Sequence, residues 1–269
     1  MSRETGPARA PTIAAMTNDG GGRAVLVTGA SRGIGAAVAR AFAEAGDRVA
    51  VHHGRNAEKA RAVAAALPGD GHAVVGADLA DPDAVRAMVD EAAERLGGLD
   101  VLVNNAGIFE PHPIAETTYE EWQKGWRDTL GVNLVGAANV TWCAVRHMLR
   151  AGGGRIVNVS SRGAFRGEPG QPAYGASKAG LIAFGQSLAR DLGPHGITVA
   201  AVAPGFTETD MAAEELTGER GVARRAESPL GRVSTPEDVA AAVVFLASPA
   251  ATMATGAVLD VNGASYLRM

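Results

Sequence analysis

A tyrosine, a lysine and a serine in this chain are spaced so that they could transfer a proton together. Tyr174 and Lys178 stand four positions apart, which places two side chains on one face of a helix, and Ser161 precedes Tyr174 by thirteen positions. Free tyrosine has a pKa of about 10, and a neighbouring cation favours phenolate, so we expect Lys178 to lower the pKa of Tyr174. A serine hydroxyl beside the phenol would hold a carbonyl oxygen while the proton passes. This chemistry is that of carbonyl reduction or alcohol oxidation.

The tyrosine–lysine spacing by itself also fits a helix face that is simply exposed to solvent. The chain contains only three lysines, Lys59, Lys124 and Lys178, among 25 basic residues, so lysine is not its usual surface cation. This composition favours a functional reason for Lys178. Ser160 is the alternative to Ser161, although its spacing to Tyr174 differs by one position.

Short apolar runs alternate with alanine-rich helical stretches along most of the chain. The runs that we predict as strands are Ala24–Val27, Arg48–Val51, His72–Val75, Asp100–Val103, Arg155–Val159, Ile197–Val202 and Ala257–Val261. The predicted helices cover residues 34–45, 56–67, 82–96, about 119–149, about 173–192 and 236–247. Two of them, at 82 and 236, begin with a capping residue followed by proline.

Apolar runs without polar alternation indicate strands that are buried on both faces, and their alternation with helices indicates parallel crossovers. The sequence therefore predicts an α/β fold: a single doubly wound (Rossmann) domain over residues 23–269, with a seven-stranded, mainly parallel sheet and helices on both faces. In such folds ligands bind beyond the carboxyl ends of the strands. Residues 1–22 contain few large apolar groups and are predicted to form a disordered leader, within which Met16 is an alternative start.

The first strand runs into a turn with glycines at 29, 33 and 35, directly before the first helix. Glycines permit a tight turn and a close approach of backbone to a phosphate, and the helix N-terminus offers unpaired N–H groups to the anion. A plain structural turn is the alternative. The position between strand and helix favours a pyrophosphate-binding turn.

Together these motifs make the chain resemble the short-chain dehydrogenases/reductases. The turn Thr28–Gly35 resembles the family's Thr-Gly-x-x-x-Gly-x-Gly pattern, Asn104–Gly107 resembles its Asn-Asn-Ala-Gly motif, and Pro204-Gly205 resembles the segment that passes the nicotinamide. Asn133, Ser161, Tyr174 and Lys178 match its catalytic tetrad in order and spacing. The likeness covers residues 23–263 and is greatest to bacterial 3-oxoacyl-[acyl-carrier-protein] reductases.

The resemblance implies a role for each member of the tetrad. Tyr174 would exchange a proton with the substrate oxygen, and Lys178 would lower the tyrosine pKa and hold the ribose hydroxyls. Ser161 would hold the carbonyl oxygen, and Asn133 would support a water relay. The residues expected to bind the cofactor are Gly29, Ser31, Arg32, Gly33, Ile34, Gly35, Arg55, Asp78, Leu79, Asn105, Ala106, Gly107, Tyr174, Lys178, Pro204, Gly205, Thr207 and Thr209.

The end of the second strand favours NADP(H) over NAD(H). An acidic residue there would bind the ribose 2′-hydroxyl and repel a 2′-phosphate, but this chain reads Val-His-His-Gly-Arg over residues 51–55. Arg32 and Arg55 are predicted to pair with the phosphate. Solvated surface arginines are the alternative.

Substrate contacts are expected from residues 162–171 and from the segment 206–230, whose mixture of acids, arginines and small residues is typical of a lid. Arg162 and Arg166 either meet an anionic substrate or face solvent. The main hypothesis is an NADP(H)-dependent oxidoreductase that acts on a carbonyl or secondary alcohol, for which a 3-oxoacyl thioester is one candidate. The alternatives are an NAD-dependent dehydrogenase of sugars, steroids or other secondary alcohols, and a non-catalytic cofactor-sensing protein, which would not need the tetrad.

Composition narrows the classes of partner. A net charge of −4 without a basic run argues against nucleic-acid binding, and no apolar stretch approaches the roughly 20 residues that span a bilayer. The single cysteine, Cys143, excludes an internal disulfide framework and predicts a cytoplasmic location. The six histidines lack metal-ligand spacing, so no metal is predicted. The resemblance implies a homotetramer or homodimer.

Overall fold

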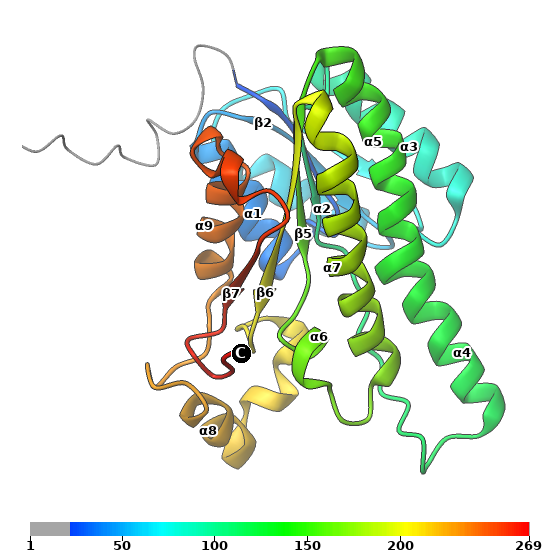
Figure 1. The fold of residues 1–269 in the computed structure, drawn as a ribbon, viewed down its shortest axis with the longest axis vertical. Coiled ribbons are helices and arrows are strands. Elements are labelled where there is room, and N and C mark those ends of the chain that lie inside the picture. Colours follow the sequence, from blue (N-terminus) through cyan, green and yellow to red (C-terminus); the bar gives the residue numbers. More distant parts are fainter. Residues whose placement is uncertain (1–21, 269) are drawn as a thin grey trace, which may run out of the picture.

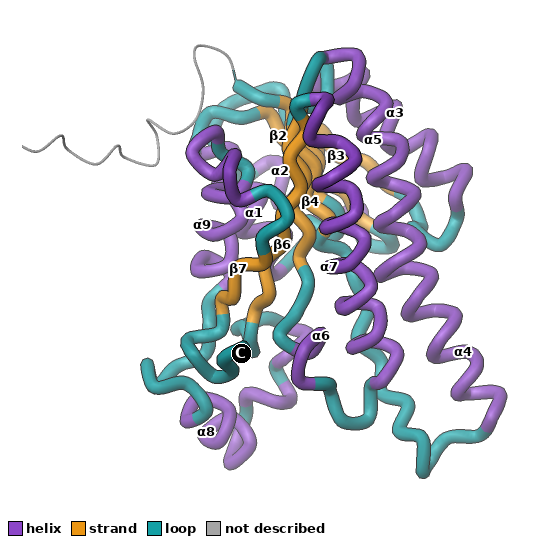
Figure 2. Tube along the Cα trace, in the orientation of Figure 1, coloured by secondary structure: helices purple, strands orange, loops and turns teal. Residues whose placement is uncertain are grey.

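The computed structural model of the protein describes residues 22–268. Within this range seven parallel strands form one sheet in the order β3-β2-β1-β4-β5-β6-β7 (Figures 1 and 2). The strands are β1 Ala24–Val27, β2 Arg48–His53, β3 Ala73–Gly76, β4 Val101–Asn104, β5 Gly154–Val159, β6 Ile197–Pro204 and β7 Val258–Val261. The predicted α/β doubly wound fold is confirmed, and every strand pair is parallel.

Helices cover both faces of the sheet because its central strands are apolar on both sides. One apolar core joins β1, β2 and β5 to α1 Gly33–Glu44, α2 Ala57–Ala65 and α9 Pro236–Leu246. The other core lies on the opposite face, against α3 Pro82–Leu96, α5 Ala137–Ala151 and α7 Pro172–Leu192 (Figure 1). Successive strand residues alternate between the two cores: Val25 and Val27 belong to one, and Leu26 belongs to the other.

The order of the strands reverses next to β1. The chain proceeds outward from β1 to β2 and β3, and then returns to place β4 on the other side of β1. Loops that leave β1 and β4 therefore diverge to opposite faces of the sheet and leave a crevice at the carboxyl edge. This edge is where the predicted site residues gather.

The helical region expected over 119–149 is not one continuous α-helix. A capping box of Thr118 and Glu121 begins α4, Tyr119–Leu130, and a π-helical segment, Gly131–Gly136, then leads into α5. At Gly136 a β-carbon would lie 2.6 Å from the carbonyl oxygen of Leu79, so the widened turn passes directly against the chain after β3. Asn133 lies within this π segment. Its side chain is tied to a neighbouring loop, and such interruptions of a helix are common at functional sites.

Two short helices that the sequence does not predict lie at the carboxyl edge of the sheet. They are α6, Gly163–Arg166, which follows β5, and α8, Gly218–Ala226, which follows β6 (Figures 1 and 2). Among residues 22–268 no helix has the length and apolarity needed to cross a membrane. The predicted leader, apart from Gly22, lies outside the described residues.

Candidate active site

A cavity of about 840 Å³ lies along the carboxyl edge of the sheet, from the glycine-rich turn after β1 to Tyr174 on α7. All eighteen residues that the sequence predicts to bind a cofactor line this cavity, and so does Ser161. Strands β1 to β6 therefore bring together predicted residues that are up to 180 positions apart in the chain.

The turn between β1 and α1 is shaped for close approach of an anion. Gly29 and Gly33 adopt φ angles of +65° and +53°, which residues with a β-carbon rarely adopt. A β-carbon at Gly35 would lie 2.4 Å from the carbonyl oxygen of Gly29, so helix α1 packs on the turn only with glycine there. The first turn of α1 holds no acidic residue, and its N-cap, Arg32, makes no side-chain capping bond. The N–H groups of this helix end fit the pyrophosphate of a dinucleotide.

The Asn-Asn-Ala-Gly segment after β4 forms hydrogen bonds with the glycine-rich turn after β1. The Asn105 side-chain amide donates to the carbonyl oxygens of Thr28 (2.8 Å) and Gly29 (3.1 Å). The Thr28 hydroxyl in turn accepts from the backbone N–H groups of Asn105 and Ala106 at 3.0 and 3.1 Å. These bonds fix the ends of β1 and β4 to one another, which holds the crevice open at a defined width.

Tyr174, Lys178 and Ser161 face the same part of the cavity. Tyr174 and Lys178 lie one turn apart near the start of α7, with the lysine Nζ 5.7 Å from the centre of the phenol ring. Lys178 is 3% exposed and donates a hydrogen bond of 2.9 Å to the carbonyl oxygen of Val159. Ser161 follows β5, and its hydroxyl accepts from the N–H of Gly163 at 3.0 Å. Phe109 packs edge-on against Tyr174, with ring centres 4.8 Å apart.

The expected lowering of the tyrosine pKa by Lys178 is wrong for this structure. Burial raises the pKa of Tyr174 to about 12, the Ser161 hydroxyl acts in the opposite direction, and the charge of Glu168 raises the pKa further. Burial also lowers the pKa of Lys178 to about 8. Loss of hydration thus dominates both pKa shifts. For both groups the neutral form is populated over a wider pH range here than it is in water.

Asn133 lies one layer behind the cavity wall. Its side chain accepts from the N–H of Ile108 (2.8 Å) and donates to the carbonyl oxygen of Ile108 (3.0 Å) and to the Ser177 hydroxyl (3.2 Å). A β-carbon at Gly107 would lie 3.3 Å from Asn133 Oδ1 and 3.4 Å from Lys178 Nζ, so these two polar groups flank the same glycine. Asn133 joins the loop after β4 to helix α7.

Ser160, the alternative serine, points elsewhere. It is 4% exposed, and its hydroxyl donates to the carbonyl oxygen of Lys178 at 2.9 Å, which ties β5 to α7. The Ser160 hydroxyl is thus engaged with the backbone of α7. The spacing to Tyr174 had selected Ser161 instead.

The far end of the cavity, beside β2 and β3, is lined by basic side chains. Arg32, Arg55 and Lys59 all border it, while the end of β2 carries no carboxylate. Arg32 lies 3.6 Å from Asp210, but both side chains are more than half exposed, so this ion pair contributes little. Asp78 accepts from the N–H of Ala80 at 3.0 Å and stabilises the loop after β3.

The predicted substrate-side segments do reach the cavity. Arg162 and Glu168 line it from the loop after β5, and Phe206, Met211 and Glu215 line it from the segment after β6. Arg162 does not face solvent: it is 2% exposed and pairs with Glu227 at 2.7 Å. Arg166 lies 3.4 Å from the same carboxylate.

Three cavity residues make contacts that their positions in the sequence do not indicate. They are Phe109, Glu168 and His52. His52 is 1% exposed; its Nδ1 accepts from the N–H of Gly29 at 3.0 Å, and its Nε2 lies 3.1 Å from the carbonyl oxygen of Ala77. Only the adjacency of two histidines marks this position in the sequence, and it does not indicate the partners. Within residues 22–268 no group of three or more His, Cys, Asp or Glu is placed to hold a metal.

Comparison with known proteins decides the family. A family model described as Enoyl-(Acyl carrier protein) reductase matches residues 29–264. The 3-oxoacyl-[acyl-carrier-protein] reductase of Staphylococcus aureus (strain Mu50 / ATCC 700699) is 42% identical over 247 residues, which cover 91% of this chain and 98% of the relative. The chain belongs to the short-chain dehydrogenase/reductase family.

This short-chain dehydrogenase/reductase is also similar to members with other names. The cis-4-hydroxycyclohexanecarboxylate dehydrogenase of Sinomonas cyclohexanicum is 43% identical over 244 residues, 90% of this chain and 95% of the relative. A crystal structure of a short chain dehydrogenase from Burkholderia cenocepacia J2315 in complex with NADP superposes with a TM-score of 0.82 at 41% identity, over 91% of this chain and 98% of that one. The enzyme is an oxidoreductase of this family.

Proposed function

We propose that this enzyme is an NADP(H)-dependent reductase of 3-oxoacyl thioesters that works in the cytoplasm. The observation that carries the proposal is the continuous cavity that runs from the glycine-rich turn to Ser161, Tyr174 and Lys178. Relatives with 3-oxoacyl-[acyl-carrier-protein] reductase names support the substrate class, and the NADP complex of a similar chain supports the cofactor. The basic residues beside β2 agree with a cofactor that carries a 2′-phosphate.

The cofactor supplies hydride when bound, and the side chains of this chain supply a proton and hold the carbonyl. Ser161 donates a hydrogen bond to the carbonyl oxygen, and Tyr174 transfers its phenol proton to that oxygen as the oxygen becomes negative. The high pKa of Tyr174 keeps the phenol protonated at neutral pH, which suits a proton donor in reduction. Lys178, close to the ring, then stabilises the phenolate that remains. Asn133 binds the backbone of Ile108 in the loop after β4, and its side chain and that of Lys178 both lie beside Gly107.

A dehydrogenase of a cyclic secondary alcohol is the second candidate. The relative named for cis-4-hydroxycyclohexanecarboxylate favours it, because it is as similar to this chain as the reductase relatives are. The same residues would act in reverse, with Tyr174 taking the proton of the alcohol.

Removal of the phenol hydroxyl tests the catalytic assignment. Tyr174→Phe is expected to lower kcat for reduction of acetoacetyl-N-acetylcysteamine by NADPH by roughly 10²–10⁴-fold, because positioned proton transfer contributes about that much. Loss of NADPH absorbance measures the rate, while NADPH fluorescence and circular dichroism show that the variant still binds cofactor and is folded. An active Tyr174→Phe enzyme would refute the assignment.

We also propose that copies of the chain associate as a homotetramer or homodimer. Large apolar side chains are exposed on two separate surfaces, one with Val135 and Trp142 beside α5, and one with Phe245 and Leu259 on α9 and β7. A closed oligomer would cover such surfaces.

A further inference from the structure

Glu168 places a carboxylate in the part of the cavity where the proposed reaction occurs. It lies in the loop between α6 and α7, and its half-buried side chain lines the cavity together with Ser161 and Tyr174. Its negative charge acts on the Tyr174 hydroxyl and raises the pKa of that group. The carboxylate therefore lines the same cavity as the serine and tyrosine that would act on the substrate carbonyl.

The loop holds this side chain in a defined position. Gly167 and Gly170, with φ angles of +75° and +74°, bound the turn, and the N–H of Gln171 donates to the Glu168 carbonyl oxygen at 3.1 Å. A β-carbon on Gly163 would lie 2.6 Å from Glu168 Cγ and 2.9 Å from Oε1, so the side chain rests on the bare backbone of Gly163. The N–H of that same glycine binds the Ser161 hydroxyl.

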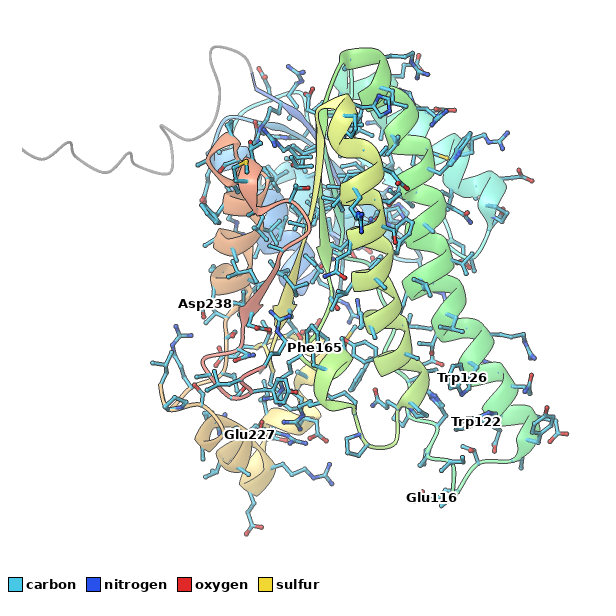
Figure 3. The ribbon with its side chains drawn as sticks, viewed as in Figure 1. Glu116, Trp122, Trp126, Phe165, Glu227 and Asp238 are labelled. Carbon is cyan, nitrogen blue, oxygen red and sulfur yellow. The ribbon has the colours of Figure 1, made fainter. Side chains whose placement is uncertain are left out.

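The arginines around Glu168 have other partners. Arg162 and Arg166 lie 2.7 and 3.4 Å from Glu227, and Arg224 lies 2.8 Å from Glu227 and 2.9 Å from Glu215. Figure 3 shows Glu227 beside α8, at the same end of the molecule as Phe165 of α6. Within residues 22–268 the Glu168 carboxylate makes no hydrogen bond and no ion-pair contact within 4 Å. It is thus available to act on what enters the cavity.

We propose that Glu168 is a specificity-determining residue that favours neutral acyl substrates, such as thioesters, over the corresponding free oxo-acid anions. The inference rests on the proposed reductase function and assigns a residue that selects for its substrate class. A free 3-oxo acid carries a carboxylate two carbons from the reacting carbonyl, and this group would meet the charge of Glu168. A thioester or amide at that position carries no charge and avoids the repulsion.

The test compares two substrates of nearly equal size and different charge, acetoacetamide and acetoacetate. We expect the wild-type enzyme to reduce the amide with a kcat/KM at least about tenfold higher, a ratio that corresponds to about 1.4 kcal/mol. Like charges a few ångströms apart at a partly solvated site repel by at least about this much. In Glu168→Gln, measured at mildly alkaline pH, the ratio is expected to fall toward one. Glu168→Asp is expected to keep most of the discrimination.

Control measurements separate failure of this inference from failure of the proposed function. Glu116→Gln removes an exposed carboxylate of the loop before α4 (Figure 3) that does not line the cavity, and it should leave the ratio unchanged. If acetoacetyl-N-acetylcysteamine is reduced normally but Glu168→Gln shows the wild-type ratio, or if the wild type prefers acetoacetate, the role of Glu168 is wrong. If the thioester is not reduced at all, the proposed function fails and this inference fails with it.

Discussion

Single residues around the cavity have their charge states set mainly by burial. Burial raises the pKa of Tyr174 to about 12 and lowers that of Lys178 to about 8 and that of His52 to about 4. In each case burial shifts the equilibrium toward the neutral form, because a charged group loses its hydration. With a pKa that stays above 7, Lys178 remains mostly charged at neutral pH, as its proposed role beside a Tyr174 phenolate requires.

His52 is a clear case in which the hydrogen-bond partners define the protonation state. The N–H of Gly29 donates to Nδ1, and the carbonyl oxygen of Ala77 can only accept, so the hydrogen resides on Nε2 and the ring is neutral. One imidazole thereby ties the glycine-rich turn after β1 to the end of β3. A second proton on the ring would break the bond to Gly29.

Protonation of His52 is expected to destabilise the folded protein on the acid side. Its pKa is 6.5 in an unfolded chain and about 4 in the folded protein, so between these values the unfolded chain binds a proton that the folded chain does not. Stability is therefore lost as the pH falls from 6.5 to 4, by about 3 kcal/mol in total for this group. Urea unfolding of the wild type and of His52→Gln, whose amide can replace both bonds, measures this contribution. Parallel pH profiles for the two proteins would contradict it.

Among the elements, the N-terminal end of α1 and the end of β2 together form the basic part of the cavity. Helix α1 begins after Arg32, and the chain leaves β2 through Gly54 and Arg55. Neither arginine has a strong partner in the described part of the chain, where the nearest carboxylate to Arg32 is the exposed Asp210. Both side chains are free to pair with a 2′-phosphate.

Removal of both cations is expected to reduce the preference for NADPH. In Arg32→Ala/Arg55→Ala the kcat/KM for NADPH should fall by at least about tenfold while that for NADH changes little, because a hydrogen bond to a charged group contributes about 1.5–3 kcal/mol. Initial rates with both cofactors measure this. Arg61→Ala, which removes an exposed arginine of α2 outside the cavity, is the matched control. Comparable efficiency with NADH in the wild type, unchanged in the double variant, would overturn the NADP(H) preference.

For the whole molecule, the exposed apolar surfaces bear on assembly. Val135 and Trp142 are seven positions apart, which places them on one face of the helical region, and they are 53% and 57% exposed. The guanidinium of Arg146 lies 5.1 Å from the centre of the Trp142 ring. Trp142 belongs to α5, which lies on the side of the molecule away from α8 in Figure 1.

A charge on this face is expected to break the proposed oligomer. Light scattering after size exclusion should give the mass of a dimer or tetramer for the wild type and a smaller assembly for Trp142→Glu, because a buried unpaired carboxylate disfavours the interface. Val222→Glu alters an exposed residue of α8 and should leave the mass unchanged. A monomeric wild type, or a Trp142→Glu protein of wild-type mass, would contradict the proposal.

The sequence by itself determined the features that depend on local spacing. Uninterrupted apolar runs determine which segments become buried parallel strands, and glycines at 29, 33 and 35 determine the turn after β1. The spacing of Ser161, Tyr174 and Lys178 places the serine just after a strand and the other two on one face of the next long helix, so that all three line the cavity. These features need only the pleat, the helical repeat and the backbone freedom of glycine, which are local properties.

Only the tertiary structure decided the features that depend on distant neighbours. The sequence predicted a lowered tyrosine pKa, but the depth of burial is set by elements from across the chain and reverses the shift. Arg162 was expected at the surface or on a substrate, but the fold brings Glu227 to it and leaves Glu168 facing the cavity instead. Desolvation and long-range pairing follow from which surfaces the packed elements cover, and no local spacing contains that information.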